Sequence, residues 1–407
     1  MWVTPPQRGA TIWKDRLKMN DIKPNNKPVC INFSSGPCTK RPGWSVDSLD
    51  GALLGRSHRS KLGKEKLQKS IDQTIEILKI PEGYKVGIVA GSDTGAIEMA
   101  MWNLLGSKPV EILAWEVFGN DWKKDILEQL KINDSNTHVA GFGDIPDLSK
   151  INFDNDVIFT WNGTTSGVKV PNADWIPSNR KGLILCDATS AVFAQNIEWN
   201  KLDVVTFSWQ KVLGGEAAHG IIVLSPKALK HLEIFSPNWP IPKIFRLTKA
   251  NKVIEGIFKG ETLNTPSMLC VEDYLDALKW VKKVGGLNGC IARANDSFNL
   301  INKWISRSKS IDFLCEKETN RSNTSVCLKF SDERVIRKDD DTQRQLAKEI
   351  GVLLESESVA YDIVNHRSAP PGLRIWTGAT IESSDVEALL PWIDWAYEKA
   401  FKKIIEQ

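Results

Sequence analysis

The sequence has 407 residues, which exceeds the usual size of one domain and predicts two lobes. Apolar residues make up 42% and charged residues 25% of the chain, which are the proportions of a globular protein and exclude a disordered, collagen-like or coiled-coil chain. The 53 basic residues nearly balance the 50 acidic ones, so the net charge of +3 gives no reason to expect a nucleic acid or a membrane surface as a partner.

The cysteines indicate the compartment. There are seven, and no two of them form a CxxC pair, so we expect reduced thiols in a cytoplasmic protein rather than a disulfide framework. No metal-ligand spacing is present, and no metal is expected. No stretch reaches the ~18 uncharged apolar residues of a membrane-spanning helix. Residues 1–30 lack the apolar segment of a signal peptide, and Met19 is an alternative start that would place residues 1–18 outside the native protein.

Helices and short apolar strands alternate in the first two thirds of the chain. Hydrophobic periodicity predicts helices at 64–78, 94–105 and 121–130, and strands at 85–90, 110–114, 157–161, 182–186, 204–208 and 220–224. Such alternation predicts an α/β fold with a mostly parallel sheet covered on both faces. Ligands of such sheets bind beyond the carboxyl ends of the strands, so functional residues should directly follow the strands.

The last third of the chain has a different pattern. A long helix is expected at 267–284, ending at Gly285-Gly286, and it would bridge the two lobes. Helices at 290–306, 342–354 and 385–402, with strands near 326–330 and 373–375, predict a smaller α+β domain. The acidic cluster at 339–341 predicts a solvated turn with a helix-capping role. The predicted division is an N-terminal arm at 1–45, a large domain at 46–285 and a small domain at 286–407.

Three short motifs follow predicted strands. Residues 91–95 (GSDTG) join a strand to a helix, where backbone N–H groups and the helix dipole favour an anion such as a phosphate. Asp187 comes directly after a buried strand. Lys211 follows the next strand and precedes Gly214-Gly215, and a partly desolvated lysine there can form an imine. Each motif alone also fits a cap, a turn or a surface charge. Together they supply the anion site, the acid and the imine lysine that pyridoxal 5'-phosphate requires.

With these motifs the chain resembles the class V aminotransferases of the fold-type-I pyridoxal phosphate enzymes, and within them the phosphoserine aminotransferases. The resemblance runs from residue 31 to about residue 380 and includes four further segments, which are Ser57-His58-Arg59, Asn162-Gly163-Thr164, Asn264-Thr265-Pro266, and His366-Arg367 with Gly372-Leu373-Arg374. It implies a large domain with a mostly parallel seven-stranded sheet and a smaller α+β C-terminal domain.

The resemblance also implies the cofactor site. Lys211 would form the imine, as an internal aldimine, and move the substrate proton, and Asp187 would pair with the pyridinium nitrogen. The implied cofactor-binding residues are Asp93, Thr94, Phe118, Thr164, Asp187, Gln210, Lys211, Asn264 and Thr265. At the phosphate turn, Asp93 and Thr94 replace the glycine and arginine that are common in the family.

Two of these implications concern the surroundings of the cofactor ring and the assembly. Phe118 is the expected aromatic neighbour of the ring, with Trp115 and Trp122 as alternatives. Asn264 and Thr265 would reach the cofactor phosphate of the neighbouring subunit, which implies a homodimer with shared active sites.

Basic residues would bind the substrates. By resemblance Arg374 binds the α-carboxylate, while His58, Arg59, His366 and Arg367 surround the second anionic group of the substrate. The implied reaction is a ping-pong transfer of the amino group from L-glutamate to 3-phosphohydroxypyruvate, giving O-phospho-L-serine and 2-oxoglutarate. It serves serine biosynthesis and, through formation of 4-phosphohydroxy-L-threonine, pyridoxine biosynthesis.

Three alternatives remain open. One is a serine–glyoxylate or alanine–glyoxylate type of class V aminotransferase. Another is a cysteine desulfurase, for which Cys327 would be the nucleophile, although its alternating surroundings predict a strand and a packing role. The third is a non-catalytic protein that binds a phosphorylated metabolite on the same scaffold.

Overall fold

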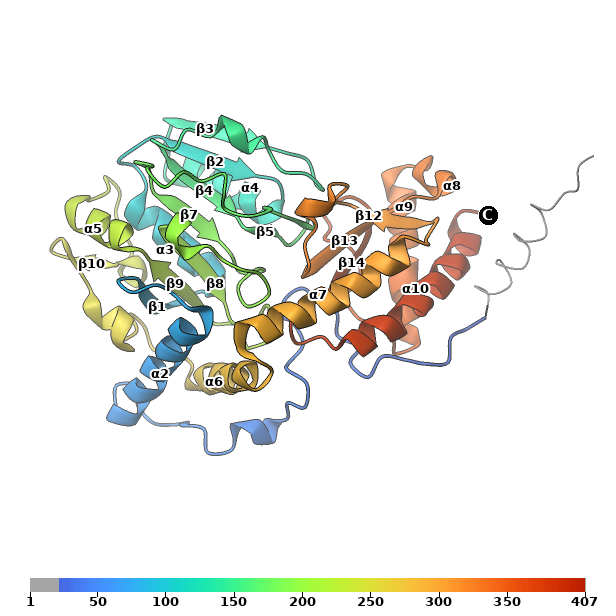
Figure 1. Cartoon of the computed structure of the whole chain (residues 1–407), viewed down its shortest axis with the longest axis horizontal. Coiled ribbons are helices and arrows are strands. Elements are labelled where there is room, and N and C mark those ends of the chain that lie inside the picture. Colours follow the sequence, from blue (N-terminus) through green and yellow to red (C-terminus); the bar gives the residue numbers. More distant parts are fainter. Residues whose placement is uncertain (1–21, 407) are drawn as a thin grey trace, which may run out of the picture.

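The computed structural model describes residues 22–406, so the origin of residues 1–18 lies outside the described residues. A seven-stranded sheet lies at the left of Figure 1 and a three-stranded sheet at the right. Helix α7 (Gly286–Ile305) runs between them. All seven strands of the large sheet precede this helix and all three strands of the small sheet follow it.

The large sheet is mostly parallel, as predicted. Its strands are β1 (Lys85–Ala90), β2 (Val110–Ala114), β3 (Ser135–Val139), β4 (Asp156–Thr160), β7 (Ile184–Asp187), β8 (Val204–Ser208) and β9 (His219–Leu224). Their order is β1-β9-β8-β7-β4-β2-β3, and only β9 runs antiparallel to its neighbours. The strands from β9 to β2 are buried along their whole length, which explains their continuous apolar sequences.

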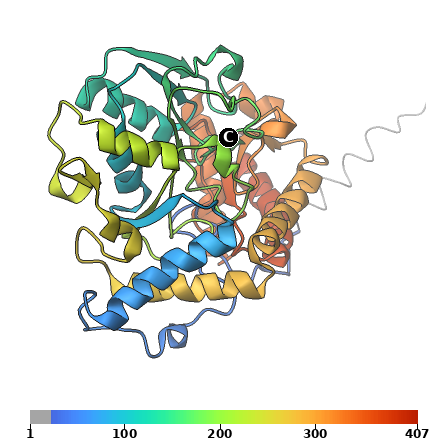
Figure 2. The ribbon, with the colours of Figure 1, turned by 60° about the vertical axis from the view of Figure 1, so that its left-hand side comes forward.

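Helices cover both faces of this sheet. Apolar residues of α3 (Ser92–Leu104), α4 (Val117–Lys124) and α5 (Pro226–Ile234) form the core on one face. On the other face the core includes α2 (Lys61–Leu78) and α6 (Met268–Lys283), which lie together in Figure 2. The helix predicted at 121–130 begins earlier, because the side chain of Glu116 accepts a hydrogen bond from Gly119 N and caps α4. It then continues as a π-helical segment, Asp125–Gln129.

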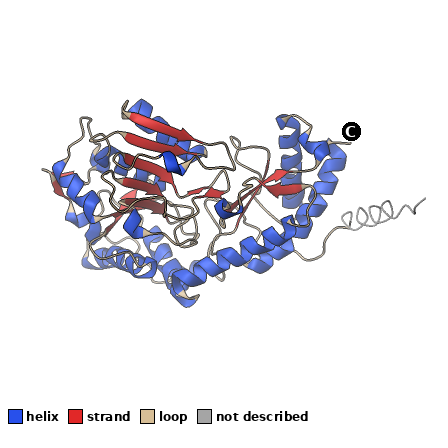
Figure 3. Cartoon of the chain, turned by 45° about the horizontal axis from the view of Figure 1, so that its top comes forward, coloured by secondary structure: helices blue, strands red, loops and turns tan. Residues whose placement is uncertain are grey.

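The C-terminal part has the expected α+β composition (Figure 3). Strands β12 (Ile311–Phe313), β13 (Ser325–Phe330) and β14 (Gly372–Trp376) form an antiparallel sheet packed against helices α7, α9 (Asp340–Ser356) and α10 (Ser383–Ile404). The short helix α8 (Glu333–Ile336) precedes α9. Asp339 caps α9 by accepting a hydrogen bond from Thr342 N at 2.7 Å, which confirms the role predicted for the acidic cluster.

The described part of the N-terminal arm connects both lobes. Val29 N donates to Asp385 at the start of α10 (2.7 Å), and Asn32 bridges to Tyr361. Farther along, Arg41 forms a bidentate ion pair with Asp276 on α6. Between these anchors the arm passes the end of β8, where it contacts Lys211. No described helix is long and apolar enough to cross a membrane.

Candidate active site

A pocket of about 260 Å³ lies at the carboxyl edge of the large sheet. The ends of β7 and β8, the first turn of α3, helix α4 and the N-terminal arm all contribute to it. Its lining residues are Gly36, Pro37, Ser92, Asp93, Thr94, Phe118, Trp122, Asp187, Thr189, Ser208, Gln210, Lys211 and Ala217. The three sequence motifs, which lie far apart along the chain, therefore meet in one pocket.

Lys211 lies in this pocket between the arm and α4. Its Nζ donates a hydrogen bond to Ser35 O at 2.6 Å and lies 6.0 Å from the ring centroid of Phe118. A Cβ at Gly36 would come within 2.6 Å of Nζ, so the glycine leaves room for the amine. Burial, followed by the positive charge of Arg374, lowers the pKa of Lys211, although nearby anionic groups partly oppose this shift. The neutral, nucleophilic amine is therefore more populated than in a surface lysine.

Asp187, at the end of β7, is held by two N–H groups. Its Oδ1 accepts from Thr189 N at 3.0 Å and its Oδ2 accepts from the Trp122 indole at 3.2 Å. The Asp93 carboxyl lines the same pocket and is close enough for the two carboxyl groups to interact. Only 5% of Asp187 and 6% of Asp93 is exposed. The result is a buried carboxylate that is oriented for a cationic partner in the pocket.

The turn before α3 is tightly constrained. Gly91 (φ 84°) and Ser92 (φ 53°) both adopt left-handed backbone conformations, and both N–H groups donate to Ala218 O. At Gly95 a Cβ would lie 2.1 Å from Ala90 O, so only glycine allows the helix to start so close to β1. The first turn of the 13-residue helix α3 thus faces the pocket, where its N–H groups and dipole favour an anion.

Three of the predicted substrate-binding residues, Arg374, His366 and Arg367, lie near one another, and Arg374 is also close to Lys211. Burial is the largest cause of the lowered pKa of Lys211 and of His366. The positive charge of Arg374 on β14 lowers both pKa values further, and that of Arg367 also lowers the pKa of His366. Nε of Arg374 is buried without a hydrogen-bond partner among the described residues. Within residues 22–406, Arg59, Arg367 and Arg374 make no ion pair. Three arginines are therefore available for anions.

Other predicted residues lie outside the lining of this pocket. His58 is half-buried and Arg59 is exposed in the segment before α2, and Asn264 and Thr265 lie in the loop before α6, where Thr265 is exposed. Thr164 is buried, and its hydroxyl group is hydrogen-bonded to Ser190 Oγ.

Sequence reasoning missed Thr189 and Ser208, which line the pocket and share a hydrogen bond of 2.9 Å between their hydroxyl groups. A signal was present in the sequence, since Thr189 lies two residues after the end of β7 and Ser208 is the last residue of β8. Among the three candidate aromatics, Phe118 and Trp122 line the pocket, whereas Trp115 is buried in the core.

Cys327 does not have the environment of a catalytic nucleophile. It lies on β13 and is 2% exposed, and burial raises the pKa of its thiol to about 12. All seven cysteines are free. Among residues 22–406 no group of His, Cys, Asp and Glu side chains could hold a metal ion.

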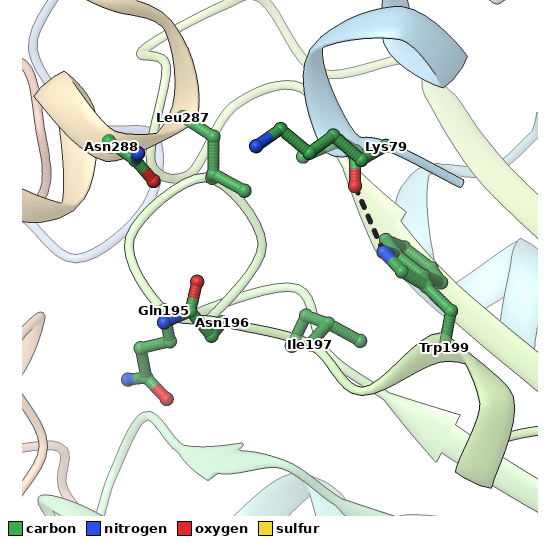
Figure 4. Close-up of a pocket in the computed structure, with 8 residues that line it drawn as sticks. Lys79, Gln195, Asn196, Ile197, Trp199, Leu287 and Asn288 are labelled. Atoms are coloured by element: carbon green, nitrogen blue, oxygen red, sulfur yellow. Dashed lines mark hydrogen bonds between the residues drawn. The ribbon is translucent and has the colours of Figure 1, made fainter. Parts of the chain in front are cut away.

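A smaller cavity of about 160 Å³ lies between the end of α2, residues 195–199 and the start of α7 (Figure 4). Its wall includes the Trp199 indole, which donates to Leu78 O at 3.0 Å, and one charged side chain, Lys79. The Lys79 residue is exposed to solvent, and no carboxyl group of the described residues lines this cavity. Of these two pockets, the larger one is therefore the candidate active site.

The residues of the larger pocket fit pyridoxal 5'-phosphate. The helix N-terminus suits the phosphate, the oriented Asp187 suits a protonated ring nitrogen, and the Lys211 amine suits the aldehyde. Oε1 of Gln210 is buried without a partner among the described residues, so this side chain is also available to a ligand. Fold and pocket together define a fold-type-I pyridoxal phosphate-dependent transferase.

Comparisons with known proteins identify the family. The chain is 53% identical to the phosphoserine aminotransferase of Methanosarcina mazei over 377 residues, which is 93% of this chain and 99% of that protein. Identity to the Methanosarcina barkeri phosphoserine aminotransferase is also 53%, over 92% of this chain and 99% of that protein. The chain belongs to the phosphoserine aminotransferase family.

A solved structure has the same fold. The phosphoserine aminotransferase of Cytophaga hutchinsonii superposes with a TM-score of 0.76 at 22% identity, covering 94% of this chain and 100% of that one. No protein-family model matches the chain. The family resemblance and the fold class expected from the sequence are confirmed.

Proposed function

We propose that the chain is a phosphoserine aminotransferase that uses pyridoxal 5'-phosphate to transfer the amino group of L-glutamate reversibly to 3-phosphohydroxypyruvate. The observation that carries the proposal is the convergence of Lys211, Asp187 and the N-terminus of α3 in one pocket, in a chain 53% identical to proteins with this activity over 93% of its length. The products are O-phospho-L-serine and 2-oxoglutarate.

The cofactor, when bound, supplies a ring that accepts the electron pair left on the substrate α-carbon. Asp187 would keep the ring nitrogen protonated, since both of its oxygens accept N–H groups and its charge is fixed in place. The first turn of α3, with Thr94, and the Gln210 side chain would hold the phosphate. Phe118 is the proposed stacking partner because it faces Lys211, with Trp122 as the alternative.

Lys211 has two roles in the proposed mechanism. Its amine would hold the cofactor through the aldehyde, for which a lowered pKa is an advantage. Once the substrate amine has replaced it, the freed Lys211 amine would be the base that takes the proton from the substrate α-carbon, and the same group would hold that proton for its return. The same residue serves both half-reactions, so the first oxoacid leaves before the second enters, as in a ping-pong mechanism.

The unpaired arginines would bind the substrates. Arg374 is proposed to bind the α-carboxylate, because it lies close to Lys211. His58, Arg59, His366 and Arg367 are proposed to bind the phosphate of phosphoserine or the second carboxylate of glutamate. The same set suits the phosphorylated oxoacid that leads to 4-phosphohydroxy-L-threonine, so a role in pyridoxine biosynthesis is included in the proposal.

The proposed assembly is a homodimer with shared active sites. Thr265 is exposed, and neither it nor Asn264 lines the pocket of its own chain, as expected if both reach the cofactor phosphate of the other subunit. Thr164 is proposed to approach the phenolic oxygen of the cofactor after exchanging its hydrogen bond with Ser190. The free thiols support a cytoplasmic location.

One experiment tests the activity and separates the alternatives. The absorbance of the purified protein with cofactor is recorded before and after addition of L-phosphoserine without an oxoacid, and L-alanine, L-serine and L-cysteine serve as comparison substrates. Loss of the visible band with phosphoserine and with glutamate supports the proposal. A band that responds only to alanine, serine or cysteine contradicts the substrate assignment, and a protein that never develops the band contradicts the enzymatic function.

A further inference from the structure

Asp93 is an acidic residue at a position where an anion is expected to bind. It is the second residue of α3, the helix whose N-terminus is proposed to hold the cofactor phosphate. A negative charge at this position would repel a phosphate dianion. The helix start is nevertheless packed tightly on the sheet, because a Cβ at Gly220 would lie 2.1 Å from Ser92 O and a Cβ at Gly95 equally close to Ala90 O. An acid is thus held next to a proposed anion site.

The surroundings of Asp93 decide its protonation. Its carboxyl group lines the same pocket as the Asp187 carboxyl and is close enough for the two charges to interact, and the Thr206 hydroxyl and the Lys211 amine are also nearby. Two carboxylates in such contact in a buried site cannot both be ionised, and a helix dipole worth about 0.3–1 kcal/mol does not offset their repulsion. Burial first, and then the charge of Asp187, raise the pKa of Asp93 well above its ordinary value.

The hydrogen bonds show which of the two carboxyl groups carries the proton. Each oxygen of Asp187 accepts one N–H group, from Thr189 and Trp122, and each oxygen can accept a further donor, so Asp187 is the acceptor of the pair. Oδ1 of Asp93 is buried and has no hydrogen-bond partner among the described residues. A neutral Asp93 carboxyl can donate to Asp187, whereas an ionised one would leave this buried oxygen charged and without a hydrogen-bond donor.

We propose that Asp93 is a positioning residue that stays neutral and donates a hydrogen bond to Asp187, so that the acid pair carries one negative charge directed at the ring nitrogen. This inference rests on the proposed function. It explains how an acidic residue can occupy the phosphate turn, since the neutral group does not oppose the phosphate. It also gives Asp187 a third hydrogen-bond donor, beside Thr189 N and the Trp122 indole.

The protonation state is tested by infrared spectroscopy on the cofactor-free protein. At about pH 9 Glu116, Asp156 and Asp394 are ionised, since burial raises the pKa of Glu116 only to about 7 and those of Asp156 and Asp394 to about 6. We expect one carbonyl stretch of a neutral carboxyl group, which Asp93→Asn removes and the control Asp156→Asn retains. Absence of this band in the wild type, or its persistence in Asp93→Asn, would overturn the proposal.

The hydrogen bond is tested by cofactor affinity in variants whose thermal unfolding shows that they are folded. Asp93→Asn keeps a neutral donor, so its dissociation constant should stay within about threefold of the wild type, while Asp93→Ala should bind about tenfold to a hundredfold more weakly. Equal losses in both variants would contradict the donor role. Tighter binding by Asp93→Asn would show that Asp93 is charged. A wild type that binds no cofactor would contradict the proposed function but leave the infrared result standing.

Discussion

The substitution Asp187→Asn tests the central contact of the proposed site. In the structure both oxygens of Asp187 accept N–H groups, from Thr189 at 3.0 Å and from the Trp122 indole at 3.2 Å. An asparagine has one acceptor oxygen, so its amide nitrogen would face one of these donors and leave a buried N–H group without a partner. The negative charge that would pair with the ring nitrogen is lost as well.

The expected loss of cofactor affinity in Asp187→Asn follows from the unpaired N–H group and the lost charge. A buried donor without a partner costs about 1–3 kcal/mol, and replacing a charge-assisted hydrogen bond by a neutral one costs about 1 kcal/mol. The affinity for the cofactor should therefore fall by about 2–4 kcal/mol, or roughly 30- to 1,000-fold. The kcat of the enzyme with saturating cofactor should also fall, because the ring nitrogen no longer has a counter-charge.

The assay is a titration of cofactor-free protein with pyridoxal 5'-phosphate, followed by absorbance, at constant pH. The matched control is Asp156→Asn, since Asp156 is equally buried but lies at the opposite edge of the sheet, where it accepts from Leu183 N at 2.7 Å. We expect the control to bind cofactor within about threefold of the wild type. An Asp187→Asn protein with native thermal stability and wild-type affinity would refute the placement of Asp187 against the ring.

Further predictions concern the amine, the substrate clamp and the phosphate turn. Lys211→Ala should lose multiple turnover entirely, and retained turnover would discard the mechanism. Burial lowers the pKa of Lys211, so the rate at which the visible cofactor band develops should rise with pH and level off below the ordinary lysine pKa of about 10.4. A rate that levels off only above this pH would contradict a buried Lys211 amine. Arg374→Ala should raise KM for glutamate and phosphoserine alike by about 10- to 100-fold, whereas an effect on phosphoserine alone would assign Arg374 to the phosphate. Gly95→Ala should lower the free energy of unfolding in urea by about 1–3 kcal/mol, because its Cβ meets Ala90 O, while Gly141→Ala, in open space, should change it by less than about 1 kcal/mol. Equal effects of the two glycine variants would refute the steric argument.

The core strands of the large sheet and most helices were predictable from local sequence. Strands β1, β2 and β8 have their predicted bounds, because each is a short apolar run that is buried or nearly buried on both faces. Strand β3 was missed, since it lies at the edge of the sheet and its polar residues are largely exposed. The antiparallel direction of β9 was not predictable either, because a single apolar strand contains no information about its neighbour.

The sequence by itself determined the chemistry, namely an anion turn, an acid and a lysine after successive strands, in an order that resembles one family. Those signals are local, since each depends on a residue type at the end of a strand. The tertiary structure alone decided which side chains and backbone groups surround Asp187 and Lys211. It placed Asp93 against Asp187, gave Asp187 the Trp122 indole as a donor, and brought Ser35 and Arg374 from distant segments to Lys211. Protonation and orientation depend on burial and on contacts between segments far apart in the chain, and only the folded chain creates them.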